Sequence, residues 1–334
     1  MPPATSLAAT PPDAGPAGRA RRAAGVGAAL LQRRGALVAL VAACAFGVMR
    51  YYAFATPENL VNVLRQNSML GLVALGMTVV ILTGGIDLSV GALLAVAGVV
   101  AARVSGSGSL VAFAAGVGTA ALLGLVNGLL VARVRIAPFV VTLAMLTAAR
   151  GAALALTGEQ SVPLAPAAEA LAWTGRGTLG PVPVPVALLV LAYAAGAVLL
   201  RHTRFGRTVY ATGDSEEAAR LMGLRVDRTL VATYALSGAL AGLAGVVLAA
   251  RLGAGQPVAG TGWELDAIAA VVVGGTLLTG GRGGVGSTLV GVLLLGVIFN
   301  LLNLEGTISP WWQWVVRGAF LLGVVLVQGR LRAR

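Results

Sequence analysis

Few residues of this chain could carry out chemistry. The sequence has one cysteine, Cys44, and one histidine, His202, among 334 residues. These counts exclude an internal disulfide, a metal site of several cysteines and a metal site of clustered histidines. The chain also lacks lysine, whereas a P-loop needs a lysine on the β and γ phosphates of ATP. We therefore expect no catalytic residue, no metal site and no bound cofactor in this chain, and any ATP-driven step would need a second polypeptide.

The most unusual polar segment is GDSEEAARLMGL at residues 213–224, because it lies between strongly apolar stretches. Asp214 can serve as the N-cap of a short helix, with Glu217 three residues later as in a capping box, and Gly223 can end the helix. Such a helix has about two turns and is not stable alone in water. We therefore expect it to dock on another surface.

The side chains of this helix predict an apolar face ringed by charge. Apolar and charged residues separate around it at the three-and-four spacing of a helix: Ala218, Leu221 and Met222 against Glu216, Glu217 and Arg220. The pattern alone leaves two interpretations open. The segment lies on the membrane surface as an amphipathic turn, or it inserts into a soluble partner on the cytoplasmic side.

The elements that must position these residues are membrane helices. The chain is 57% hydrophobic and 11% charged, and its apolar runs approach the roughly 20 residues that cross a bilayer. Its 47 glycines fit closely packed transmembrane helices. We therefore predict an all-α polytopic integral membrane protein with a transmembrane domain at 35–330. Ten spans are predicted near 35–54, 68–83, 86–104, 109–132, 138–156, 184–201, 229–250, 264–280, 285–304 and 310–328.

The basic residues predict the orientation of the chain. All 24 are arginines, and they fall between the apolar spans rather than on one soluble face, which argues against nucleic-acid binding. Because arginines gather in short cytoplasmic loops, we expect both termini in the cytoplasm. Residues 1–34 are then a disordered cationic leader, residues 202–228 a cytoplasmic loop, and the Pro-rich residues 157–183 an external loop.

Three long blocks of sequence resemble one known family, in the same order and at the same distances. They are GMTVVILTGGIDLSVGALLAVAG (76–98), HTRFGRTVYATGDSEEAARLMGL (202–224) and ARLGAGQPVAGTGWELDAIAAVVVGGTLLTGGRGGVGSTLVG (250–291). From about Thr56 to the C-terminus the chain resembles the permease subunits of bacterial ABC sugar importers, the ribose-type family. The resemblance implies import of a monosaccharide by alternating access across the bacterial plasma (inner) membrane, with no enzymatic activity in the permease itself.

In that family the segment matching residues 213–224 is the coupling helix, which docks in a groove of the ATPase subunit. The resemblance implies that a partner ABC ATPase binds ATP and Mg²⁺ and that an extracytoplasmic sugar-binding protein delivers the cargo. It also implies a second permease copy, as a homodimer or heterodimer surrounded by membrane lipid. The residues implied in ATPase coupling are Gly213, Asp214, Glu216, Glu217, Ala218, Ala219, Arg220, Leu221 and Gly223.

A neutral sugar needs hydrogen-bonding groups along its path and few charges. Polar residues within or next to the predicted spans are candidates for this path, and for each of them the alternative is a bridge to a neighbouring helix. They are Asn67, Ser68, Thr78, Asp87, Ser89, Asn127, Thr142, Asn300 and Asn303. Glu264 and Asp266, with Trp263, are candidates for an external gate or a binding-protein contact, and helix capping is the alternative for Glu264.

Asp87 has two compatible interpretations. An acidic residue close to or within the membrane is a functional candidate, and after two glycines Asp87 is also well placed to cap a helix that begins at Leu88. A cap at a helix break can border the substrate path. The preceding motif VILTGG (80–85) is echoed by TLLTGGRGG (276–284), and we interpret both as glycine hinges or tight turns on the same side of the membrane.

Two other functions fit parts of this pattern. The same importer architecture could carry a nucleoside, an autoinducer or another small polar solute, because the family motifs lie in hinges and the coupling helix rather than at the cargo. An ion-coupled secondary transporter would need a relay of intramembrane acids or histidines. Beyond Asp87 the predicted spans offer few such residues.

Overall fold

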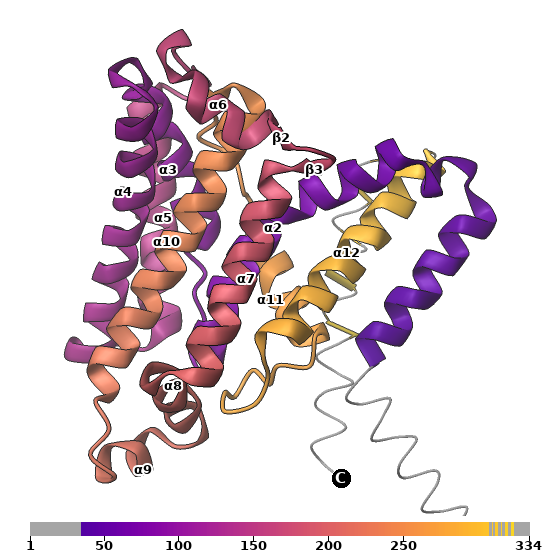
Figure 1. Ribbon diagram of the computed structural model, residues 1–334. Helices are drawn as coiled ribbons and strands as arrows, with labels where there is room; N and C mark the ends of the chain where they lie inside the picture. The colour runs from indigo at the N-terminus through magenta and orange to yellow at the C-terminus, as the bar shows by residue number, and fades with distance from the viewer. Residues whose placement is uncertain are drawn as a thin grey trace, which may run out of the picture.

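The computed structural model describes residues 35–306 together with 309, 311–312, 315, 318–319 and 322–323. The predicted leader at 1–34 and most of the predicted span at 310–328 lie outside the described residues. The described part of the chain is a bundle of helices with two short two-stranded sheets (Figure 1). The all-α prediction is therefore confirmed.

Six helices of the described part are long and apolar enough to cross a membrane. They are α2 (Pro57–Leu82), α4 with a π-helical extension (Ser109–Val134), α5 (Pro138–Thr157), α7 (Val184–His202), α10 (Val226–Leu252) and α12 (Val285–Glu305). The apolar helices Gly35–Arg50 and α3 (Val90–Arg103) are shorter, as is α11 (Trp263–Val273). The count of ten spans therefore remains a prediction.

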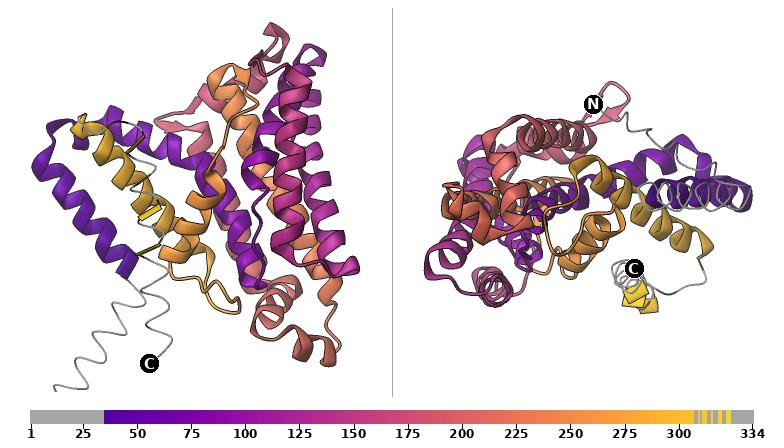
Figure 2. Two further views of the ribbon diagram at one scale, coloured as in Figure 1. Left: turned by 180° about the vertical axis from the view of Figure 1, so that it is seen from behind. Right: turned by 90° about the horizontal axis from the view of Figure 1, so that it is seen from below.

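Shorter elements lie at the two ends of the bundle. The helices α8 (Arg204–Asp214) and α9 (Glu216–Leu221) are at one end, and α6 (Glu169–Arg176) is at the opposite end (Figures 1 and 2). Strands β2 (Thr178–Leu179) and β3 (Val182–Pro183) form a hairpin, and β1 (Val162–Pro163) pairs antiparallel with β4 (Ala254–Gly255). The 3₁₀ turns are Tyr52–Ala55, Ser105–Ser107 and Pro166–Ala168.

Two predicted helix boundaries were wrong. Helix α2 begins at Pro57 rather than near residue 68, because the Thr56 hydroxyl accepts a backbone hydrogen bond as N-cap and proline occupies the first helical position. The polar side chains of its first half hid this start from a search for apolar runs. In the predicted span 264–280 the helix ends at Val273, and a turn follows in which Gly275 has φ +98°.

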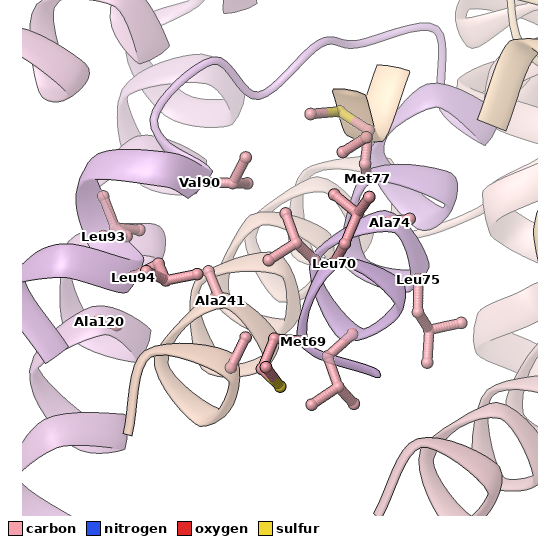
Figure 3. Packing of buried hydrophobic residues seen from close by; sticks show 14 of the residues in the cluster. Met69, Leu70, Ala74, Leu75, Met77, Val90, Leu93, Leu94, Ala120 and Ala241 are labelled. Atoms are coloured by element: carbon pink, nitrogen blue, oxygen red, sulfur yellow. The ribbon is translucent and has the colours of Figure 1, made fainter. Parts of the chain in front are cut away.

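The hydrophobic core lies where α2, α3, α4 and α10 meet. Every residue of α2 from Asn67 to Leu82 is buried. Leu93 and Leu94 of α3 pack in the same cluster as Ala120 of α4 and Ala241 of α10 (Figure 3). A helix buried on all sides fits the centre of a membrane bundle, and here α2 has that position.

Helices α4 and α10 approach each other through small residues. A Cβ added at Gly124 of α4 would collide with the carbonyl oxygen of Tyr234, and one at Gly238 of α10 with the carbonyl oxygen of Ala120. In lipid, such close backbone contact replaces the hydrophobic effect as the force between helices. The glycine enrichment of the sequence thus has a structural cause at this contact.

Replacing Gly124 with alanine is expected to lower the free energy of unfolding by about 1–3 kcal/mol, because the added methyl group meets backbone atoms that have no rotamer to change. The measurement is thermal unfolding of the purified protein in detergent. Gly118→Ala on the same helix is the matched control, since nothing lies within 4 Å of its added Cβ. Equal stability of both variants would show that the contact between α4 and α10 is loose.

Candidate functional site

The predicted short helix exists, but its cap differs from the prediction. Helix α9 spans Glu216–Leu221, and its N-cap is Ser215, whose hydroxyl accepts a hydrogen bond from the Ala218 N–H at 3.2 Å. Asp214 is instead the last residue of α8. An N-cap needs a non-helical backbone, and the chain becomes extended only at Ser215, with φ −161° and ψ 111°.

The end of α9 agrees with the prediction. The helix ends at Leu221, and Gly223 follows with φ +77°, a conformation that glycine adopts without steric cost. The Gly223 N–H donates to the carbonyl of Arg220 at 2.9 Å. Gly223 as the stop of this helix is therefore confirmed.

The apolar face of α9 is open to its surroundings. The exposed fraction is 83% for Leu221 and 67% for Met222, and Ala218 and Glu217 are exposed as well. Both side chains are therefore available for contact with a partner protein or with the membrane surface, the two interpretations that the sequence leaves open.

One residue predicted to face a partner points the other way. Ala219 is fully buried and packs in a cluster with Ala132, Val226 and Leu230. Its neighbours along the helix are more exposed, because a six-residue helix that lies on the bundle packs only one narrow face against it. Ala219 therefore anchors α9 to the bundle, and its assignment to the exposed surface was wrong.

Arg220 holds α9 to the start of α10. Its guanidinium group lies 2.8 Å from the carboxylate of Glu216 and 2.5 Å from that of Asp227. Hydrogen bonds to Asp227 and then to Glu216 raise the pKa of Arg220 above its usual value. The positive charge predicted to face a partner is thus largely matched within the chain.

A second polar region is a small cavity of about 100 Å³ between α2, α11 and α12. Among the described residues, its lining is rich in side-chain amides and contains no arginine. The lining residues are Asn62, Val63, Gln66, Asn67, Leu70, Trp263, Asp266, Gly296, Phe299, Asn300 and Asn303. We call this space the polar cavity.

The polar cavity brings together residues that are distant in the sequence. It contains three predicted path residues, Asn67, Asn300 and Asn303, and two predicted gate residues, Trp263 and Asp266. Sequence reasoning missed the amides at 62 and 66, because the start of α2 was placed after them. Asp266 and Glu264 both lie in the first turn of α11, where a carboxylate also stabilises the helix dipole.

Hydrogen bonds tie α2 to α12 along the polar cavity. Asn59 and Asn300 exchange two amide hydrogen bonds, at 3.1 and 2.8 Å. The hydroxyls of Thr78 and Thr288 lie 2.8 Å apart and are both buried. These two links at separate heights hold the helices as one unit.

The other predicted path residues form a separate buried network. One carboxylate oxygen of Asp87 accepts from the N–H and hydroxyl of Ser89, at 3.0 and 2.5 Å, and the other accepts from the hydroxyl of Ser237 at 2.8 Å. The amide of Asn127 donates to the Ser89 hydroxyl at 3.0 Å. The hydroxyl of Thr142 lies 2.9 Å from the carbonyl of Pro138 on its own helix and 3.2 Å from the carbonyl of Ile86. This network joins α3, α4, α5 and α10 to the break after α2.

Asp87 and Ser68 have local roles in this geometry. Helix α3 begins at Val90 with Ser89 as N-cap rather than at Leu88, and Asp87 stabilises this entry by accepting from the backbone two residues later. The hydroxyl of Ser68 donates to the carbonyl of Leu64 on its own helix at 2.7 Å. Neither residue is among those that line the polar cavity.

A membrane bundle with a short exposed helix at one end and a polar cavity between its helices is the arrangement expected of a transport permease. Residues 59–325 match the family described as branched-chain amino acid transport system / permease component. The chain belongs to this permease family and is a multi-pass membrane protein.

Several curated relatives match most of the chain. The ribose import permease protein of Escherichia coli (strain K12) is 43% identical over 306 residues, which cover 90% of this chain and 95% of the relative. That of Bacillus subtilis (strain 168) is 44% identical over 283 residues, or 84% and 88%. The L-arabinose ABC transporter permease protein of Azospirillum brasilense is 37% identical over 275 residues, or 82% and 80%. No solved structure gives a significant match.

Proposed function

We propose that this chain is the membrane-spanning permease subunit of an ABC importer that carries a monosaccharide, ribose or a related sugar, across the bacterial inner membrane. Membership of the permease family and the similarity to ribose and arabinose permeases support the transport of a sugar rather than a nucleoside or another cargo. The observation that carries the coupling role is the exposed apolar tip of α9, formed by Leu221 and Met222.

In this proposal α9 docks on a partner ATPase, which binds ATP and Mg²⁺. The loop at 202–228 and both termini then lie in the cytoplasm, and the loop at 157–183 faces an extracytoplasmic sugar-binding protein. The position of α9 and α6 at opposite ends of the bundle supports the placement of these two loops on opposite sides of the membrane (Figure 1). Two permease copies of about ten spans each would complete the transporter.

The polar cavity is the part of the sugar path that the proposal assigns to this chain. Amide groups offer both donors and acceptors to hydroxyl groups, and the cavity also contains an aromatic ring, Trp263. Its volume is about 100 Å³. Alternating access requires this cavity to open to one side of the membrane at a time.

Reconstitution tests the proposed function directly. The chain is purified with the ATPase that it retains from native membranes and placed in liposomes with the cognate binding protein. We expect uptake of labelled ribose or arabinose that depends on ATP. Uptake driven by an ion gradient without ATP would instead support a secondary transporter and contradict the proposal.

The polar cavity gives a further prediction. Replacing Gln66 and Asn303 together with alanine is expected to lower sugar uptake about thirtyfold, because two hydrogen bonds of about 1 kcal/mol each are lost along the path. Binding of the ATPase should be unchanged. Ser68→Ala is the control, since its hydroxyl bonds within α2 and outside the cavity. Equal uptake by the double variant and the control would place the sugar path elsewhere.

A further inference from the structure

The two sequence motifs that echo each other meet in space. The first turn follows α2 at Thr83–Gly85, and the second lies between α11 and α12. The N–H of Gly281 donates to the carbonyl of Leu82 at 3.1 Å. Gly84 and Gly280 both have positive φ, +83° and +87°, which glycine adopts readily. Two tight turns far apart in the sequence are therefore joined through their backbones.

The end of α8 lies directly on this hydrogen bond. A Cβ added at Gly213 would collide with the Leu82 carbonyl oxygen and the Gly281 nitrogen, the two atoms that form the bond. A Cβ added at Gly280 would in turn lie 2.9 Å from the Cα of Gly213. We call this contact of Gly84, Gly213, Gly280 and Gly281 the glycine junction.

Two side chains of α8 strengthen the glycine junction. The hydroxyl of Tyr210 donates to the carbonyl of Gly283 at 3.0 Å. The carboxylate of Asp214 covers Gly281 so closely that a Cβ there would collide with it. Ser215 follows at once and caps α9, so only Asp214 and Ser215 separate Gly213 of the junction from α9.

Two of the helices that line the polar cavity, α2 and α12, end or begin next to the glycine junction. Helix α2 reaches it at Leu82, α11 ends at Val273 shortly before the second turn, and α12 begins at Val285 directly after it. The cavity residues of α2, from Asn62 to Leu70, lie about 18–30 Å from Leu82 along the helix, at a rise of about 1.5 Å per residue. Because α2 and α12 are tied by the Thr78–Thr288 pair, a displacement at the junction moves both.

We propose that the glycine junction transmits movement of α9 to the polar cavity. This inference rests on the proposed docking of α9 on an ATPase. Backbone contacts without intervening side chains have no rotamers that could absorb a displacement, and packed protein interiors transmit strain. Movement of α8 and α9 therefore tilts α2 and α12 together and changes the width of the cavity at their other ends.

Gly213→Ala in the full transporter, reconstituted with its ATPase and binding protein, tests the junction. The added methyl group forces α8 away from the Leu82–Gly281 hydrogen bond. Gly213, which the resemblance places among the coupling residues, packs on Leu82 and Gly281 rather than at the exposed end of α9. We therefore expect the ATPase to co-purify with the variant, while sugar uptake falls about tenfold and by more than ATP hydrolysis does. The ATP hydrolysed per sugar imported then rises, which a purely structural defect would not produce.

Two further variants make the test decisive. Gly286→Ala is the control, because it lies in the first turn of α12 and nothing is within 4 Å of its added Cβ. Tyr210→Phe adds no volume and removes one hydrogen bond, so uptake should fall about fivefold even if Gly213→Ala does not fold.

The results distinguish failure of the junction proposal from failure of the proposed function. The junction proposal is wrong if the Tyr210→Phe variant, and Gly213→Ala where it folds, hydrolyse as much ATP per imported sugar as the wild type. That result would leave the proposed docking of α9 intact. A wild-type chain that retains no ATPase would overturn both.

Discussion

Replacing Leu221 and Met222 together with glutamate is expected to weaken binding of the ATPase subunit about a hundredfold or more. Both side chains are largely exposed at the tip of α9, so the change should not disturb the fold. An apolar anchor buried at an interface contributes roughly 2 kcal/mol or more, and a carboxylate in an apolar groove adds a desolvation cost. The measurement is the amount of ATPase that co-purifies with the tagged permease.

Leu179→Glu provides the matched control for this experiment. Leu179 is also exposed, but it lies in the hairpin at the opposite end of the bundle. Its replacement should leave the co-purified ATPase unchanged. If the double variant of α9 retained the ATPase as well as this control, α9 would not be the docking element, and an amphipathic turn on the membrane surface would explain it better.

Replacing Asp87 with alanine is expected to destabilise the protein by about 3 kcal/mol or more. The change leaves three buried donors without their acceptor: the N–H and hydroxyl of Ser89 and the hydroxyl of Ser237. Each unsatisfied buried group costs about 1–3 kcal/mol. Thermal unfolding in detergent and the yield of membrane-inserted protein measure the effect.

Asp87→Asn separates structure from function at this position. Its amide oxygen can keep both hydrogen bonds from Ser89, and its NH₂ group can donate to the hydroxyl of Ser237, so the loss of stability should stay near 1 kcal/mol. Uptake should then persist. Normal assembly with complete loss of uptake would show instead that the negative charge of Asp87 acts in gating.

The pattern of apolar residues predicted the helices well and their boundaries less well. Runs such as those of α5 and α7 stand out because every turn is apolar. Helix α2 was predicted to begin too late because its first half carries the amides at 59, 62, 66 and 67, which face the polar cavity and α12. The polar face of this helix therefore looked like a loop in the sequence.

For the short helix α9, too, some features could be predicted from the sequence and others could not. Its existence, its stop at Gly223 and the apolar tip at Leu221 could be predicted from local rules. The burial of Ala219 could not, because it depends on packing against Val226 and Leu230 of the next helix. The role of Arg220 as a link to Asp227 depends on the same tertiary contact.

The sequence by itself determined the class of this protein, because hydropathy, the arginine distribution and the motif blocks are local and additive along the chain. It also supplied the two glycine motifs. Only the tertiary structure decided that they touch each other and Gly213, and that the amides of α2 and α12 share one cavity with Trp263. Contacts between the backbones of distant turns leave no periodic signal in the sequence, because that signal comes from side chains and glycine has none.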